Sequence, residues 1–75
     1  MSEYPEILEP ARRHGIADND TLHAWRHGRP VEFQDTAQMI VGPDPAGNTL
    51  ELGYDTERHV IFHSMKARQK YLPRR

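Results

Sequence analysis

The chain contains no cysteine, so disulfide cross-links and thiolate metal sites are excluded. It also has no long apolar segment. The longest uncharged apolar stretch, Met39–Val41, is far shorter than the roughly 20 residues that a membrane-spanning helix needs. The first residues are acidic and lack the apolar centre of a signal peptide. We therefore expect a protein of the cytoplasm that does not contact a membrane.

Acidic side chains are missing from the last 18 residues, 58–75, which hold six Lys or Arg residues. The first 57 residues hold all eleven acidic side chains and only four basic ones. The charge of this segment is therefore near −7 and that of the last 18 residues near +6, although the net charge of the chain is only −1. A concentrated cationic segment is typical of proteins that bind a polyanion such as RNA, or an acidic stretch of another protein. The alternative is a basic last strand that pairs with the chain's own carboxylates.

Seventy-five residues suffice for one domain, residues 1–75, with a small core. Apolar residues recur at helical spacing in two N-terminal segments before Pro30 forbids further helix. The first segment ends at His14 and Gly15, and the second begins with Asp18 or Asp20 as its cap and ends at His27 and Gly28. The first of these helices could instead begin at Pro10, which suits a first helical turn. After Pro30 the apolar period changes to two, which predicts four short strands at 31–34, 39–41, 50–54 and 60–62.

The predicted fold is therefore α+β, with two N-terminal helices packed on one face of a four-stranded antiparallel sheet. Its core is expected to contain Leu22, Trp25, Phe33, Leu50, Leu52 and Phe62. If the apolar residues of the last two strands share this core, Glu51 lies opposite His63 on the other, open face. That register needs a loop of three or five residues around Glu57, whereas a loop of two or four would shift the pairing by one. We favour the first register, and the sequence leaves both open.

In the favoured register, the open face carries the side-chain types that RNA cleavage needs. The reaction requires a base for the 2′-hydroxyl, an acid for the leaving 5′-oxygen and cations for the phosphate. Histidine exchanges a proton near neutral pH, so His63 is a candidate general acid or base, with Glu51 and His59 displayed beside it. Arg68 could bind a phosphate in bidentate fashion, and Glu51, His63 and Arg68 are the candidate catalytic residues. The remaining candidates, for RNA binding, are Lys66, Lys70, Tyr71, Arg74 and Arg75.

No metal or cofactor site is expected. His23 and His27 have the spacing of metal ligands on a helix, but Ala24 stands where a zinc-protease motif has Glu. A histidine at position 27 is also explained by the negative end of the helix dipole. The turn Gly42–Asn48 holds two glycines and two prolines but lacks the spacing of a phosphate-binding loop.

Two stretches resemble a known family. Arg13–Ile16 resembles the Lys/Arg-His-Gly-Val/Ile turn that ends a helix in BrnT-like toxins. The closing run His63–Leu72 resembles the family's last strand, with its His-x-Met-x-Ala-Arg-x-Lys-aromatic-Leu pattern. The segments Ile40–Asp44 and Leu50–Gly53 look like the group's middle strands, so the resemblance covers residues 10–72.

The resemblance implies a compact RelE-like fold and a ribonuclease toxin of a type II toxin–antitoxin system, silenced by a cognate antitoxin protein. It points to His63 and Arg68 as functional positions, with Lys70 and Tyr71 beside them. Two other hypotheses remain open. One is a non-enzymatic binding module for nucleic acid or an acidic protein, and the other is a degenerate toxin relative with a structural or regulatory role.

Overall fold

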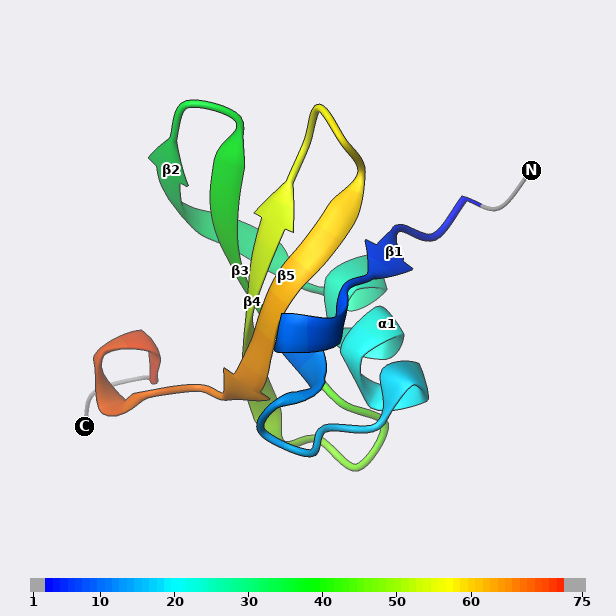
Figure 1. Ribbon diagram of the computed structural model, residues 1–75. Coiled ribbons are helices and arrows are strands. Elements are labelled where there is room, and N and C mark those ends of the chain that lie inside the picture. The colour runs from blue at the N-terminus through cyan, green and yellow to red at the C-terminus, as the bar shows by residue number, and fades with distance from the viewer. Residues whose placement is uncertain (1–2, 73–75) are drawn as a thin grey trace.

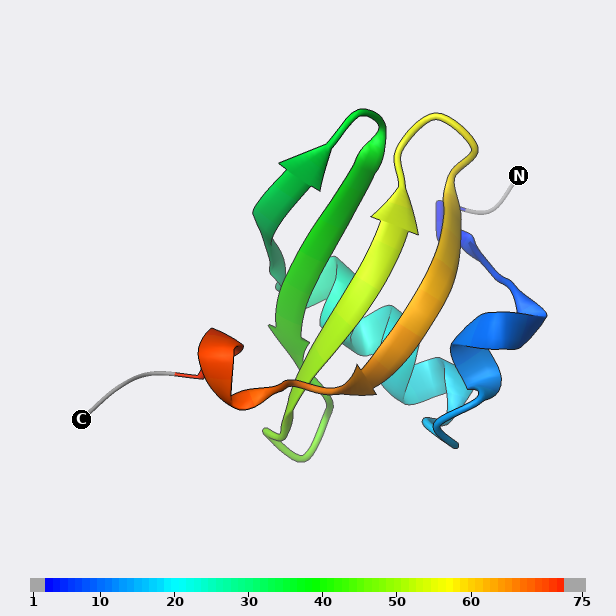
Figure 2. The same ribbon diagram turned by 60° about the vertical axis from the view of Figure 1, so that its left-hand side comes forward.

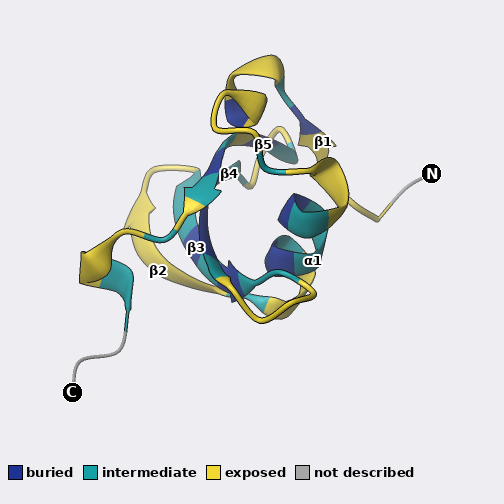
Figure 3. Ribbon diagram, turned by 90° about the horizontal axis from the view of Figure 1, so that it is seen from below, coloured by how far each residue is buried: buried dark blue, intermediate teal, exposed yellow. Residues whose placement is uncertain are grey.

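The computed structural model describes residues 3–72, which form a strongly curved sheet around one α-helix (Figures 1 and 3). The strands lie in the spatial order β1-β5-β4-β3-β2, with β1 parallel to β5 and the other neighbours antiparallel. The helix fills the concave face, and Figure 2 shows the opposite, convex face in front of it. The elements, with η for a 3-10 helix, are β1 (Glu6–Ile7), η1 (Glu9–Arg12), α1 (Asp18–His27), β2 (Arg29–Gln34), β3 (Ala37–Pro43), β4 (Thr49–Asp55), β5 (Val60–Lys66) and η2 (Gln69–Tyr71).

The prediction of two helices on a four-stranded antiparallel sheet is wrong. The first expected helix is the short 3-10 turn η1, because Pro10 limits it on one side and Gly15, with φ 75°, ends it on the other. Ahead of η1, the chain forms β1 and pairs in parallel with β5, so the sheet is mixed and five-stranded. A strand of two residues has no period that the sequence could reveal. The helix at 18–27 and the four strands after it do occur in the expected order.

The core lies between α1 and the concave face of the sheet. Leu50, Leu52 and Ile61 are at most 2% exposed, and they meet Ala24 of the helix. Helix and sheet approach closely at Gly42, since a Cβ there would collide with the carbonyl oxygen of Ala24. Leu22 and Trp25 are partly buried against this cluster.

A β-bulge in β5 decides which of its side chains reach the convex face. The loop between β4 and β5 has four residues, so Asp55 pairs with Val60 where β5 begins. A four-residue loop belongs to the shifted register, which we did not favour. Phe62 is then an extra residue, and pairing resumes with Gly53 opposite His63. Gly53 permits the bulge, because a Cβ there would lie 2.5 Å from Cε1 of Phe62. Phe62 and His63 therefore lie on the same, convex face.

The predicted register and part of the predicted core are thus wrong. Glu51 pairs with Met65 rather than with His63, although the bulge leaves Glu51 and His63 as diagonal neighbours on the convex face. Phe62 is 40% exposed there instead of buried. Phe33 is 68% exposed, because β2 is an edge strand whose residues are all exposed.

Candidate functional site

Two rows of residues cross the middle of the convex face from β5 to β2. Residues that pair on neighbouring strands point to the same face of a sheet, so each row presents its side chains together. The first row consists of Met65, Glu51, Val41 and Arg29. The second row consists of His63, Gly53, Met39 and Glu32.

The Glu51 carboxylate is the centre of the candidate site. Its side chain is 0% exposed, and Arg68 donates to it from the backbone N (2.9 Å) and Nε (3.0 Å) to Oε1 and from Nη2 (2.9 Å) to Oε2. His63 Nε2 lies 3.0 Å from Oε2. Burial alone would raise the pKa of Glu51, but the hydrogen bonds from Arg68 and His63 outweigh burial and hold the pKa below its ordinary value. Glu51 is therefore an ionised carboxylate at neutral pH.

The contact with Glu51 fixes the ring orientation of His63. An ionised carboxylate can only accept hydrogen bonds, so Nε2 of His63 carries a hydrogen and donates it to Oε2. The other ring nitrogen, Nδ1, is left for a substrate, and 28% of the side chain is exposed. A histidine held in this way can accept a proton at Nδ1 when neutral and donate one when charged.

His14 is a second histidine at this site, and the sequence analysis did not assign it a function. Its exposed ring meets that of His63 edge-on, with ring centroids 5.9 Å apart and planes at 82°. The contact arises because η1 packs beside β5 (Figure 2). In the sequence, His14 marks the end of an expected helix and belongs to the turn that resembles BrnT-like toxins. No local pattern indicates which strand that turn lies against.

Arg68 and Lys70 follow β5, where the chain crosses the start of β4 at Thr49 and continues past β3 (Figure 2). The hydrogen bond to Glu51 raises the pKa of Arg68, whose guanidinium carbon lies 5.8 Å from the centre of the Tyr71 ring. Lys70 Nζ lies 4.9 Å from the same ring centre and 3.7 Å from Oε2 of Glu32. The alternative proposed for the basic segment, pairing with the chain's own carboxylates, thus applies to these two cations.

The Tyr71 side chain is partly buried. Its hydroxyl is buried and has no hydrogen-bond partner within residues 3–72. Together with the two cations at its ring, this leaves less of Tyr71 available for base stacking than the sequence suggested.

Other candidate residues do not join the cluster. Lys66 pairs with Leu50 and therefore belongs to the concave side of the sheet, away from Glu51 and His63. Arg74 and Arg75 lie outside the described residues.

His59 was expected on the open face and is not there. It lies in the loop before β5 with φ 59°, and its Nδ1 is 2.6 Å from the Tyr54 hydroxyl. Its Nε2 is 3.0 Å from the Glu3 carbonyl oxygen, so both ring nitrogens hold the fold together. The rings of His23 and His27 are 4.5 Å apart, but no cluster of three metal-binding side chains occurs within residues 3–72.

Comparisons of this chain with family models, with curated proteins and with solved structures find no match. The resemblance to BrnT-like toxins therefore stays an expectation from the sequence motifs. Within residues 3–72, no helix combines the length and the apolar character that a bilayer span needs. The chemistry of the convex face is therefore the main indication of function.

Proposed function

We propose that this protein is a cytoplasmic toxin that cleaves RNA without a metal ion and is neutralised by a cognate antitoxin protein. The observation that carries the proposal is the buried Glu51 carboxylate, which binds His63 and Arg68 together on an exposed sheet face. Burying a charge costs free energy unless it is paired, so a carboxylate kept ionised there holds its partners in defined positions. Such charge-paired, desolvated groups are enriched at functional sites.

The proposed reaction uses the 2′-hydroxyl of the RNA as nucleophile. His63 accepts the 2′-hydroxyl proton at Nδ1, the 2′-oxygen bonds to phosphorus, and the bond from phosphorus to the 5′-oxygen breaks. The leaving 5′-oxygen takes a proton from a second group, for which the neighbouring His14 is the candidate. Arg68, with half of its side chain exposed, stabilises the charge that builds on the phosphate. Glu51 has no exposed surface, so it positions the other two residues and does not touch the substrate.

The test of this function is RNA cleavage by purified variants. His63→Ala should lower the cleavage rate by about 10²–10⁴-fold, as expected for loss of a proton-transfer group. Arg68→Ala should lower it by about 10²–10³-fold, as expected for loss of a charge-stabilising donor. Lys66→Ala is the matched control. Lys66 lies on the concave side, so this variant should cleave RNA at the rate of the parent. EDTA should leave the rate unchanged.

Two outcomes contradict the proposal in different ways. Parent-like cleavage by both His63→Ala and Arg68→Ala would place the active site elsewhere. A folded parent chain that cleaves no RNA would exclude the enzymatic function itself.

The antitoxin is proposed to cover the basic segment with an acidic stretch of its own. The support is the excess of cations in residues 58–75, of which Arg68 and Lys70 keep 51% and 55% of their side chains exposed despite their ion pairs. Co-expression with the product of the neighbouring gene should give a complex that weakens as salt rises. A salt-insensitive complex, or none at all, contradicts the partner proposal.

A second candidate function is a non-enzymatic binding module. It is favoured by one observation, namely that Glu51 also anchors the segment after β5, where Arg68 N donates to Oε1 and Ala67 N donates to the Thr49 carbonyl at 2.9 Å. The cluster then has a structural role without any chemistry. RNA that is bound but left intact by the parent chain would select this function.

A further inference from the structure

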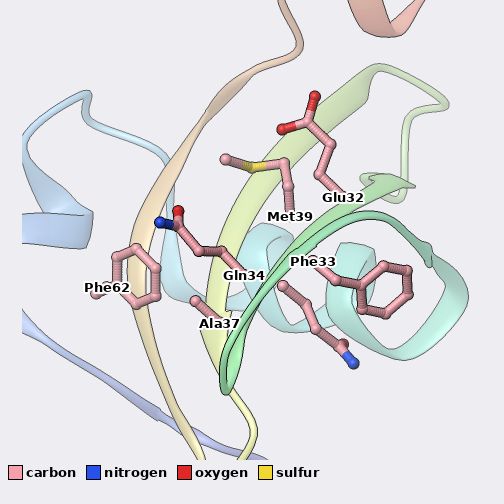
Figure 4. A pocket seen from close by; sticks show the side chains of 7 residues that line it. Glu32, Phe33, Gln34, Ala37, Met39 and Phe62 are labelled. Atoms are coloured by element: carbon pink, nitrogen blue, oxygen red, sulfur yellow. The ribbon is translucent and has the colours of Figure 1, made fainter.

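A groove opens on the convex face next to His63, between Phe62 and the edge strand β2 (Figure 4). Its volume is about 250 Å³. That is below the roughly 300–1,000 Å³ of pockets that enclose drug-sized ligands, so the groove suits a single planar ring system. Met39 and Ala37 of β3 lie between its two walls. The groove therefore offers an apolar floor with side chains rising on both sides.

Phe62 supplies a surface on which a planar ring can stack. The edge of its ring lies where a Cβ of Gly53 would be, with Cε1 and Cζ at 2.5 and 2.8 Å from that position, so β4 supports it from below. The ring is not part of the core, and 40% of the residue remains exposed. Aromatic side chains in this situation are common stacking platforms for the bases of single-stranded RNA.

The opposite wall supplies hydrogen-bonding groups. Glu32 and Gln34 are two residues apart on β2, so both side chains leave the convex face, as Figure 4 shows. A carboxylate accepts two parallel N–H groups, and an amide NH₂ donates to a carbonyl oxygen. Among the RNA bases, guanine alone presents two adjacent donors, N1–H and N2–H, next to an acceptor, O6. The 3.7 Å contact from Lys70 is longer than a direct hydrogen bond and leaves lone pairs of Glu32 available.

The groove is aligned with the cluster at His63. His63 and Glu32 stand at the two ends of one cross-strand row, separated by three strand spacings, or about 14 Å between backbones. A nucleotide lying along this row would have its base beside Glu32 and its phosphate toward His63. We infer that the groove binds the guanine base of single-stranded RNA, stacked on Phe62 and recognised by Glu32 and Gln34, with the 3′-phosphate of that nucleotide at His63. This inference rests on the proposed function, because it names the nucleotide presented for cleavage.

The experiment measures nucleotide binding in the absence of cleavage. The four nucleoside 3′-monophosphates are titrated into the protein, with affinity from calorimetry and location from backbone amide chemical shifts. Guanosine 3′-monophosphate should bind at least about 10-fold more tightly than the other three, since only guanine satisfies the carboxylate with two donors. The largest shifts should fall on Glu32, Gln34 and Phe62.

Variants separate stacking from recognition. Phe62→Ala should weaken all four nucleotides by roughly 10-fold, as loss of a stacking partner does, whereas Phe62→Tyr should bind like the parent. Glu32→Gln should remove the preference for guanine. Glu57→Gln, a matched change in the exposed loop before β5, should keep that preference.

The outcomes also distinguish this inference from the proposed function. Equal affinity for the four nucleotides, undetectable binding of all four, or shifts away from the groove would overturn the inference, even if the protein cleaves RNA. Selective binding of guanosine 3′-monophosphate in the groove by a protein that cleaves no RNA would uphold the base site and refute the catalytic function.

Discussion

Replacing Glu51 with glutamine should destabilise the folded protein by about 3 kcal/mol. Removing one partner of a buried ion pair costs about 3–5 kcal/mol, and the glutamine NH₂ would face N–H donors where an oxygen now accepts. The lower end applies here, because the side chains of Arg68 and His63 are 51% and 28% exposed and can be rehydrated. A domain of 75 residues has a total stability of roughly 4–11 kcal/mol. The variant should therefore melt roughly 12–24 °C below the parent.

Thermal and urea denaturation at pH 7, followed by circular dichroism, measure this change. Glu57→Gln is the matched control, since Glu57 is exposed and its side chain has no ion pair within residues 3–72. A fall of less than about 3 °C for Glu51→Gln, or the same fall in both variants, would refute the reasoning. The buried carboxylate would then contribute no net stability, and the placement of His63 would have to come from the strand alone.

Two further predictions concern pH and the bulge. The lowered pKa of Glu51 means that its contribution to stability is complete above its unfolded value, near 4.5, and is lost as the pH falls through the folded value. Urea unfolding between pH 3 and pH 7 should thus show a smaller acid-side loss for Glu51→Gln than for the parent, and parallel curves would contradict this. Gly53→Ala should displace Phe62 and His63, because the new Cβ would lie 2.5 Å from Cε1 of Phe62 and 3.0 Å from Cβ of His63. We expect RNA cleavage and nucleotide affinity to fall together, and unchanged values of both would show that the bulge does not set the site.

The sequence predicted the elements that carry a strong local pattern. The helix at 18–27 has acidic residues in its first turn and basic ones in its last, and the four strands after Pro30 follow an alternating period. The parallel strand β1 could not be predicted, because two residues show no period and their partner β5 lies at the other end of the described chain. The remaining error came from η1, which Pro10 and Gly15 confine to one turn.

Glu51 and His63 were predicted to share a face, and they do, although the register behind that prediction is wrong. His59, which was predicted beside them, lies in the loop before β5 instead. Two shifts of the register cancel each other. The four-residue loop after β4 shifts the pairing by one residue, which alone would have placed His63 on the concave side. The extra residue Phe62 shifts the pairing by one more, so His63 returns to the convex face. Gly53 inside the strand 50–54 is the one sequence signal for an irregularity here, because an isolated glycine in a strand suggests a bulge or a close approach. It does not indicate that the extra residue is Phe62 on the neighbouring strand. The approach of His14 depends on tertiary packing and is likewise invisible to local patterns.

The two edges of the sheet limit how another molecule can meet this protein. At one edge, β1 is only two residues long and offers little backbone for a further strand. At the other edge, β2 carries Pro30, an irregularity at Val31 and the charged Glu32, all of which oppose the addition of a strand. Growth of the sheet by a foreign strand is therefore disfavoured on both sides. We therefore expect a partner of residues 3–72 to recognise side chains on a face, with selectivity that comes from their chemistry more than from backbone hydrogen bonding.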